Sequence, residues 1–189
     1  TVLVGSNKDQ FNLHKKILEA FGGKIFLLGE VGSASILKVI TNMLAFANLI
    51  GTVEGLMLAK KAGLDLTATY HAIQASSGNS AEFETVAPTI LNGSFDTSFT
   101  LALACKDLKL MRELGDKYKI PIKFTNFIED FFKKAQEKFG PDAWTPIFTK
   151  DYEKKSGQEL RAPNFPNKMM EYNEVVKYLN KMNYNEKNN

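Results

Sequence analysis

The chain has 189 residues, of which 44% are hydrophobic and 24% are charged, and its formal net charge is +3 at pH 7. This balance predicts a globular chain with one substantial core or two small ones, and it argues against disorder. The lysines are interleaved with glutamate and aspartate, so the mild positive charge argues against a nucleic-acid-binding or membrane-surface protein.

The chain opens with a predicted strand, helix and strand. Residues 1–5, TVLVG, are typical of a strand, and so are residues 24–29, KIFLLG. Between them, Ser6 with Asp9 three residues later predicts the capped start of a helix through residues 11–23. Because such a short unit cannot cover both of its own faces, we expect it to belong to a larger, mostly parallel sheet.

A long helix is predicted over residues 33–61, which contain no proline and are apolar on most faces. Residues 39–59 are long enough to span a bilayer. That window also holds five polar residues, Thr41, Asn42, Asn48, Thr52 and Glu54. Their cost in lipid favours a helix that is buried in a core or a subunit interface over a transmembrane span.

Shorter helices follow the long one. Gly63 ends the long helix, and Thr67 is a possible N-cap of the next one. Ser80 with Glu84 marks another helix start, and Pro88 is expected to kink or divide that segment. Residues 97–119 and 121–140 predict two further helices, whose apolar positions at helical spacing are expected in the core. These positions are Leu103, Leu108, Leu110, Met111, Leu114, Phe124, Phe127, Ile128, Phe131 and Phe132.

The last part of the chain predicts less regular structure. A short helix over residues 145–157 is followed by residues 158–168, whose two prolines demand an extended segment. A final short helix is predicted over residues 169–182, and the asparagine- and lysine-rich end is expected to be frayed.

Several kinds of functional site lack support in the sequence. His14 and His71 have no second ligand at the spacing of a compact metal site, so we expect no metal. No GxSxG elbow, GxGxxG loop or Walker-type phosphate loop occurs in the 189 residues. The single cysteine, Cys105, excludes an internal disulfide and fits a reducing, intracellular compartment, and we expect it to be a small buried apolar residue. The first residues show no signal-peptide pattern.

Lys38 and Asn42 interrupt the apolar pattern of the long helix, and their spacing of four places them on one face. In one interpretation the lysine extends from a buried helix to solvent and the asparagine bonds a neighbour. In the other, Lys38 transfers protons, because a lysine on an apolar helix loses hydration and its pKa falls. Asn42 then offers a neutral donor and acceptor to a substrate oxygen.

Three motifs resemble those of one enzyme family. Residues 29–65, GEVGSASILKVITNMLAFANLIGTVEGLMLAKKAGLD, resemble the long-helix region of the β-hydroxyacid dehydrogenases, the family of 3-hydroxyisobutyrate dehydrogenase. That region carries a small-residue turn, a lysine, and an asparagine four residues later, which Lys38 and Asn42 match. FTLALACKDLKLM resembles the family's second signature through Phe99, Lys106 and Asp107. The loop SSGNS, residues 76–80, is similar to a serine- and glycine-rich loop between them.

The resemblance implies a mainly α fold and a role for each matching residue. Lys38 would be the general acid/base, and Asn42 would orient a small 3-hydroxy acid that is interconverted with its semialdehyde. Lys106 would meet NAD or NADP, and Phe99 and Asp107 would complete that side of the pocket. A homodimer or homotetramer, located in the cytoplasm or mitochondria, is also implied. Asn79 stands where some relatives carry an arginine or a bulky residue, which leaves the substrate subclass open.

The resemblance also implies a division of the chain. Residues 1–31 resemble the last strand, helix and strand of a Rossmann nucleotide-binding domain, and residues 32–157 resemble an all-helical catalytic and oligomerisation domain like the C-terminal domain of 6-phosphogluconate dehydrogenase. Residues 158–189 form a C-terminal extension, similar to the family only at LRAPNFP. We therefore expect the C-terminal portion of an enzyme, inactive by itself. The alternative is a non-catalytic helical assembly module that keeps the dehydrogenase scaffold.

Overall fold

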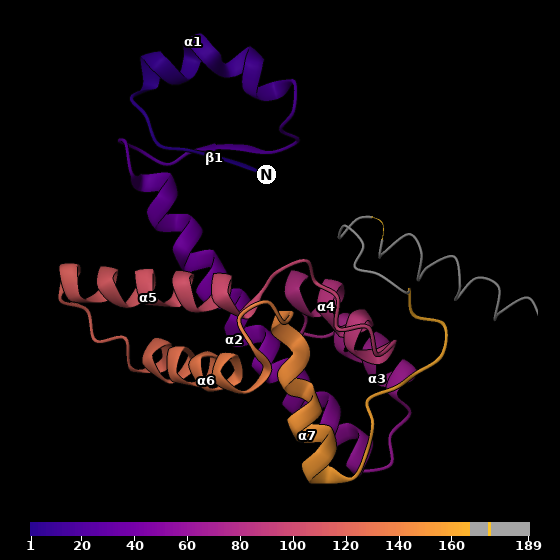
Figure 1. The fold of residues 1–189 in the computed structure, drawn as a ribbon. Coiled ribbons are helices and arrows are strands. Elements are labelled where there is room, and N and C mark those ends of the chain that lie inside the picture. Colours follow the sequence, from indigo (N-terminus) through magenta and orange to yellow (C-terminus); the bar gives the residue numbers. More distant parts are fainter. Residues whose placement is uncertain (167–173, 175–189) are drawn as a thin grey trace, which may run out of the picture.

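The computed structural model describes residues 1–166 and residue 174. The elements in chain order are β1 (Val2–Val4), α1 (Lys8–Glu19), β2 (Ile25–Leu27), α2 (Ser33–Lys61), α3 (Leu66–Gln74), α4 (Ala81–Leu91), α5 (Leu101–Tyr118), α6 (Lys123–Phe139), the 3₁₀ turn η1 (Thr145–Phe148) and α7 (Thr149–Ser156). The small unit of β1, α1 and β2 lies at one end of α2, and the other helices gather around the rest of α2 (Figure 1). The expected mainly helical fold is confirmed.

The first unit is the predicted parallel pair of strands joined by a helix. β1 and β2 pair in register from Val2 opposite Ile25 to Val4 opposite Leu27. The N-cap of α1 is Asn7, whose side chain accepts a hydrogen bond from the backbone N–H of Gln10 at 2.9 Å. The prediction of Ser6 at this position is therefore wrong by one residue, because asparagine is an equally good capping side chain.

Helix α2 has the bounds that the sequence predicts. It begins after Gly32, whose φ is 98°, and it ends just before Gly63, whose φ is 82°, so a glycine in the left-handed region marks each end. Its burial differs from the expectation. Leu44 is 52% and Leu58 is 72% exposed, so α2 is buried along one face and not all round.

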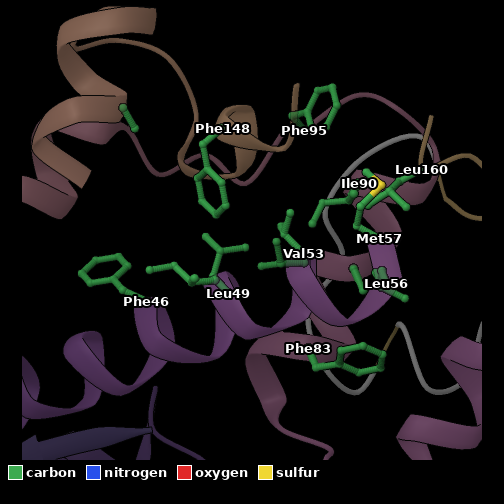
Figure 2. Close-up of a cluster of buried hydrophobic side chains, with 14 of the residues drawn as sticks. Phe46, Leu49, Val53, Leu56, Met57, Phe83, Ile90, Phe95, Phe148 and Leu160 are labelled. Atoms are coloured by element: carbon green, nitrogen blue, oxygen red, sulfur yellow. The ribbon is translucent and has the colours of Figure 1, made fainter. Parts of the chain in front are cut away.

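The buried face of α2 forms the centre of the hydrophobic core. Figure 2 shows side chains of α2 meeting those of α4, η1 and the segment after α7. From α2 the core contains Phe46, Leu49, Ile50, Val53, Leu56 and Met57. By length and composition α2 could cross a membrane. Its contacts with each of α3 to α7 instead make it the central helix of this bundle.

Helices α3 and α4 begin at side-chain caps, and Tyr70 of α3 bonds a carbonyl of α4 that Pro88 leaves free. The N-cap of α3 is Asp65, which accepts from Ala68, so the prediction of Thr67 is wrong, whereas Ser80 caps α4 as predicted. Pro88 lies inside α4 without dividing it, and it has no N–H for the carbonyl of Glu84. The Tyr70 hydroxyl donates to that carbonyl at 3.1 Å, so a residue of α3 replaces the bond that the proline removes.

Helices α5 and α6 form an antiparallel pair that packs against α2. Ile128 and Phe132 are fully buried there, as expected. Phe124 and Phe127 are 61% and 58% exposed, and Leu103 and Leu110 are also exposed. Their expected place in the core is wrong, because they lie on the helix faces turned away from it.

The last described segment packs into the core. The helix predicted over residues 145–157 divides into η1 and α7. Residues 158–166 have no regular structure, as their prolines predict, yet Leu160 is fully buried and Phe165 nearly so. The backbone N–H of Ala162 donates to the carbonyl of Leu91 at 3.0 Å, which ties this segment to α4. The helix predicted over residues 169–182 and the expected frayed end lie outside the described residues, apart from residue 174, which is helical.

Candidate active site

Lys38 and Asn42 lie one turn apart on α2, and their side chains contact each other. Lys38 Nζ donates a hydrogen bond to Asn42 Oδ1 at 2.7 Å. The spacing of four residues in a helix makes this contact possible, since it places both side chains on the same face. The sequence prediction that these two residues share one location is confirmed.

Helix α5 brings Asp107 to the same place. Asn42 Nδ2 donates to Asp107 Oδ2 at 2.5 Å, across the contact between α2 and α5. The neighbouring residue Lys106 places its Nζ 3.1 Å from Asp107 Oδ1. The side chain of Asp107 is 11% exposed, whereas that of Lys106 is 60% exposed. Four side chains therefore form a continuous polar row, in the order Lys38, Asn42, Asp107 and Lys106.

The row carries two ammonium groups, one carboxylate and one neutral amide. The buried carboxylate is balanced by the Lys106 ammonium, and it also receives the Asn42 amide. Lys38 therefore lies at one end of the row as a cationic hydrogen-bond donor, and its described acceptor is Asn42 Oδ1. A lysine ammonium has three N–H donors, so others remain for a bound oxygen after Asn42 has taken one.

Lys38 and Asp107 border an open cleft of about 750 Å³. The lining comes from residues 1–4, α2 and α5, and most of its surface is apolar. It consists of Thr1, Leu3, Ala34, Ser35, Lys38, Val39, Thr41, Asp107 and Leu110. A concave, largely apolar site with a few convergent polar groups is typical of binding sites for small molecules and cofactors.

The environment of Lys38 differs from the expectation. Lys38 is exposed in this structure, because the first turns of α2 extend beyond the core. The loss of hydration that an apolar helix predicts is therefore not found. The position of Lys38 instead rests on its hydrogen bond to Asn42.

Phe99 is not beside the other four predicted residues. It is partly buried and its ring lies 5.8 Å from that of Phe46, which is one turn beyond Asn42 on α2. Its carbonyl also accepts from the Thr145 backbone N–H at 2.9 Å. Phe99 packs on the core against Phe46, and the described lining of the cleft does not include it.

The loop of residues 76–80 lies at a second hollow, of about 340 Å³, between α2 and the junction of α3 with α4. Gly78 and Ser80 border it from the loop, and Gly51 and Gly55 border it from α2. No described residue lines both this hollow and the cleft at Lys38. The two recesses are separate.

Sequence reasoning did not identify the apolar walls of the cleft. Leu3 contributes from β1, Val39 from α2 and Leu110 from α5. Leu110 follows Asp107 by three residues on α5, and that spacing was available as a signal. Leu3 offered none, because only the position of β1 beside α2 brings it to the site.

The histidines and the cysteine lie elsewhere. His14 is exposed and its Nδ1 bonds the carbonyl of Gln10 at 2.9 Å, and the ring of His71 packs edge-on against Tyr70. Among the described residues no group of three or more histidine, cysteine, aspartate or glutamate side chains is placed to hold a metal ion. Cys105 is partly buried, and this burial raises the pKa of its thiol.

Comparisons with known proteins agree on one family. The model of a family described as NAD-binding of NADP-dependent 3-hydroxyisobutyrate dehydrogenase matches residues 32–145. The 2-(hydroxymethyl)glutarate dehydrogenase of Eubacterium barkeri is 29% identical over 134 residues, which cover 70% of this chain and 44% of that protein. The mitochondrial 3-hydroxyisobutyrate dehydrogenase of Mus musculus is 30% identical over 129 residues, which cover 65% and 38%.

The fold also matches a solved structure. The Mycobacterium tuberculosis 3-hydroxyisobutyrate dehydrogenase with L-serine superposes with a TM-score of 0.69 at 23% identity, over 78% of this chain and 53% of that one. At this identity the likeness concerns the fold alone. The chain spans about half or less of the length of the proteins that it matches.

Proposed function

The chain belongs to the NAD-binding family of NADP-dependent 3-hydroxyisobutyrate dehydrogenase, and we propose that it supplies the lysine-bearing helical part of an NAD(P)-dependent dehydrogenase of small 3-hydroxy acids. The observation that carries this proposal is the row of Lys38, Asn42 and Asp107 beside the cleft. The two named relatives act on acids with a hydroxyl at this kind of position, as their names state. The substrate is a 3-hydroxy acid such as 3-hydroxyisobutyrate, and the product is its semialdehyde.

Lys38 is the general acid/base of this reaction. In the direction of reduction, Lys38 Nζ gives a proton to the carbonyl oxygen of the substrate, and in oxidation it takes up the hydroxyl proton. Its hydrogen bond to Asn42 Oδ1 holds Nζ beside the cleft. Asn42 orients the substrate, because its Nδ2 has a second N–H besides the one that bonds Asp107, and the amide is held one turn from Lys38.

The residues beside the cleft fit a dinucleotide. The cleft of about 750 Å³ is large enough for one end of NAD or NADP, and it is open toward solvent. When bound, the nicotinamide ring supplies or takes up the hydride. Lys106 holds this cofactor, since its ammonium is exposed and its carboxylate partner Asp107 faces the cleft. Phe99 and Asp107 complete the cofactor side, Asp107 as part of the lining of the cleft and Phe99 through its packing on Phe46.

The rest of the nucleotide site belongs to a domain of which residues 1–31 form one part. The paired strands β1 and β2 and helix α1 leave Leu13, Ile17 and Phe26 between 48% and 72% exposed, as is expected of apolar faces that pack on further elements of a larger domain. In this division residues 32–157 are the helical catalytic and oligomerisation domain, and residues 158–189 are an extension. The 189 residues by themselves then turn over no hydroxy acid.

The assembly is a homodimer or homotetramer, and the compartment is reducing, cytoplasmic or mitochondrial. Exposed apolar residues on α2 and α6, among them Leu44, Leu58, Phe124 and Phe127, support self-association. The single cysteine agrees with the reducing compartment. Light scattering tests the oligomer, and a monomeric mass at every concentration contradicts it.

A substrate panel tests the function. The complete native protein is incubated with NAD⁺ or NADP⁺ and either 3-hydroxyisobutyrate or 2-(hydroxymethyl)glutarate, and the reduced cofactor is followed at its absorbance. Turnover of a 3-hydroxy acid is the expected result. The absence of turnover with every 3-hydroxy acid and both cofactors would contradict the proposal and favour the non-catalytic assembly module.

A further inference from the structure

Asp107, in the polar row, has both of its carboxylate oxygens engaged within the protein. Oδ2 accepts from Asn42 Nδ2 at 2.5 Å, and Oδ1 lies 3.1 Å from Lys106 Nζ. The residue is 9% exposed, which is unusual for an aspartate unless it is paired. The two described contacts of its carboxylate therefore run to Asn42 on one side and to Lys106 on the other.

The Asn42 amide has two orientations of nearly the same shape, related by exchange of Oδ1 and Nδ2. The carboxylate of Asp107 only accepts hydrogen bonds, and the ammonium of Lys38 only donates them. The orientation with Nδ2 toward Asp107 and Oδ1 toward Lys38 satisfies both neighbours. The other orientation places donor against donor and acceptor against acceptor, so the two charged neighbours together select one orientation.

We infer that Asp107 is a positioning residue that acts through Asn42. It holds the amide in the orientation in which Oδ1 receives Lys38 Nζ, and in this way it fixes the lysine beside the cleft. This inference rests on the proposed function for its effect on catalysis. It adds a role for Asp107 that is separate from contact with a cofactor.

The geometry predicts what happens when the carboxylate is removed. In Asp107→Ala the Asn42 amide loses the acceptor of its Nδ2, so only Lys38 still selects its orientation and the amide is held less firmly. In Asp107→Asn an acceptor oxygen remains, but the new amide N–H₂ either faces the Lys106 ammonium or faces Asn42 Nδ2. Both variants therefore disturb the lysine through the amide, and Asp107→Asn keeps the shape of the side chain.

A double-mutant cycle in the complete native protein separates this route from the alternative route through Lys106. The variants are Asp107→Asn, Asn42→Ala and both together, and a matched cycle uses Lys106→Met in place of Asn42→Ala. We expect Asp107→Asn to lower kcat on the order of tenfold by itself, and to have little further effect when Asn42 is alanine, because residues in one hydrogen-bond network couple strongly. KM for the cofactor should change less than kcat.

Two results overturn the inference. One is an equal loss of kcat from Asp107→Asn in the wild-type and Asn42→Ala backgrounds. The other is coupling to Lys106 alone, with a rise in the cofactor KM, which would make Asp107 a cofactor-side residue only.

A second readout needs no activity. The side-chain amide protons of Asn42 are observed by ¹H–¹⁵N NMR in the wild-type protein and in Asp107→Ala, with thermal melting to confirm that the variant is folded. A strong bond to a carboxylate shifts one of the two protons and slows its exchange with water. We expect the shift to disappear in the variant, and an unchanged signal would contradict the positioning role.

If no hydroxy acid is turned over, the proposed function fails while this measurement still decides the inference. If Asp107→Ala does not fold, Asp107→Leu, which also has no acceptor and is closer in size, takes its place in the comparison.

Discussion

Asn42 and Asp107 are 65 positions apart in the chain, yet Asn42 Nδ2 lies 2.5 Å from Asp107 Oδ2. The bond joins α2 to α5 at the edge of the cleft, where the core of the bundle ends. Because α2 also carries Lys38 and α5 also carries Lys106, this one contact sets the distance between the two cationic groups. The packing of two helices thus determines the geometry on which the proposed chemistry depends.

The Tyr70 hydroxyl replaces the helix hydrogen bond that Pro88 removes, and this contact gives a test of the fold. In Tyr70→Phe the carbonyl of Glu84 loses the hydroxyl that donates to it, so we expect the free energy of unfolding to fall by about 1 kcal/mol. In a Pro88→Ala background the new N–H at position 88 can bond that carbonyl, so the same substitution should cost less than half as much. Urea unfolding measures all four proteins.

Tyr118→Phe, at an exposed tyrosine, is the control and should change little. An equal cost of Tyr70→Phe in both backgrounds would show that the hydroxyl does not serve the carbonyl at Pro88.

The carboxylate of Glu129 holds α6 to α5. It is almost fully buried, with Arg112 Nε 3.0 Å and Lys133 Nζ 2.8 Å from its oxygens. Both cations are partly exposed, so water can rehydrate them after the carboxylate is removed. We therefore expect Glu129→Ala to lower the free energy of unfolding by about 2 kcal/mol, which is less than the usual cost of breaking a buried pair. Glu113→Ala, whose side chain is exposed, is the matched control, and equal effects of the two substitutions would contradict this role.

Glu82 predicts a dependence of stability on pH. Burial near the start of α4 raises the pKa of this carboxyl from 4.5 to about 7. The folded protein therefore binds more protons than the unfolded chain between these values, so the stability falls as pH rises from about 4.5 to 7. Glu82→Gln removes this loss, and we expect the variant to exceed the wild type in unfolding free energy by about 1–2 kcal/mol at pH 8, but not at pH 4.

Urea unfolding at pH 4 and at pH 8 checks this. Glu137→Gln, at an exposed position, serves as the control. The same difference between Glu82→Gln and wild type at both pH values would contradict the raised pKa.

Local signals in the sequence predict the elements well. The bounds of α2 follow from Gly32 and Gly63 and from the absence of proline between them, because each of these is a property of single residues. The N-caps are Asn7 and Asp65, but the sequence predicts neighbouring residues, because several nearby side chains can accept the same backbone N–H. The exposure of Phe124 and Phe127 was missed because helical spacing does not state how much of a helix its neighbours cover.

Local patterns likewise predict only part of the candidate site. The contact of Lys38 with Asn42 is within one helix, so its spacing predicts it. The bond from Asn42 to Asp107 and the contribution of Leu3 depend on how α5 and β1 lie against α2, which no local pattern states. The exposure of Lys38 is likewise a property of the assembled chain.

The measurement that tests the central claim most directly is kcat of Lys38→Arg in the complete native protein. Arginine keeps the positive charge and can still donate to Asn42, but it does not give up a proton in proteins. We predict that kcat for 3-hydroxy acid oxidation falls by about 10²–10⁴-fold, the usual contribution of a general acid or base. Lys61→Arg, at the other end of α2, should keep wild-type activity. Full activity of Lys38→Arg would contradict the role of Lys38 in proton transfer.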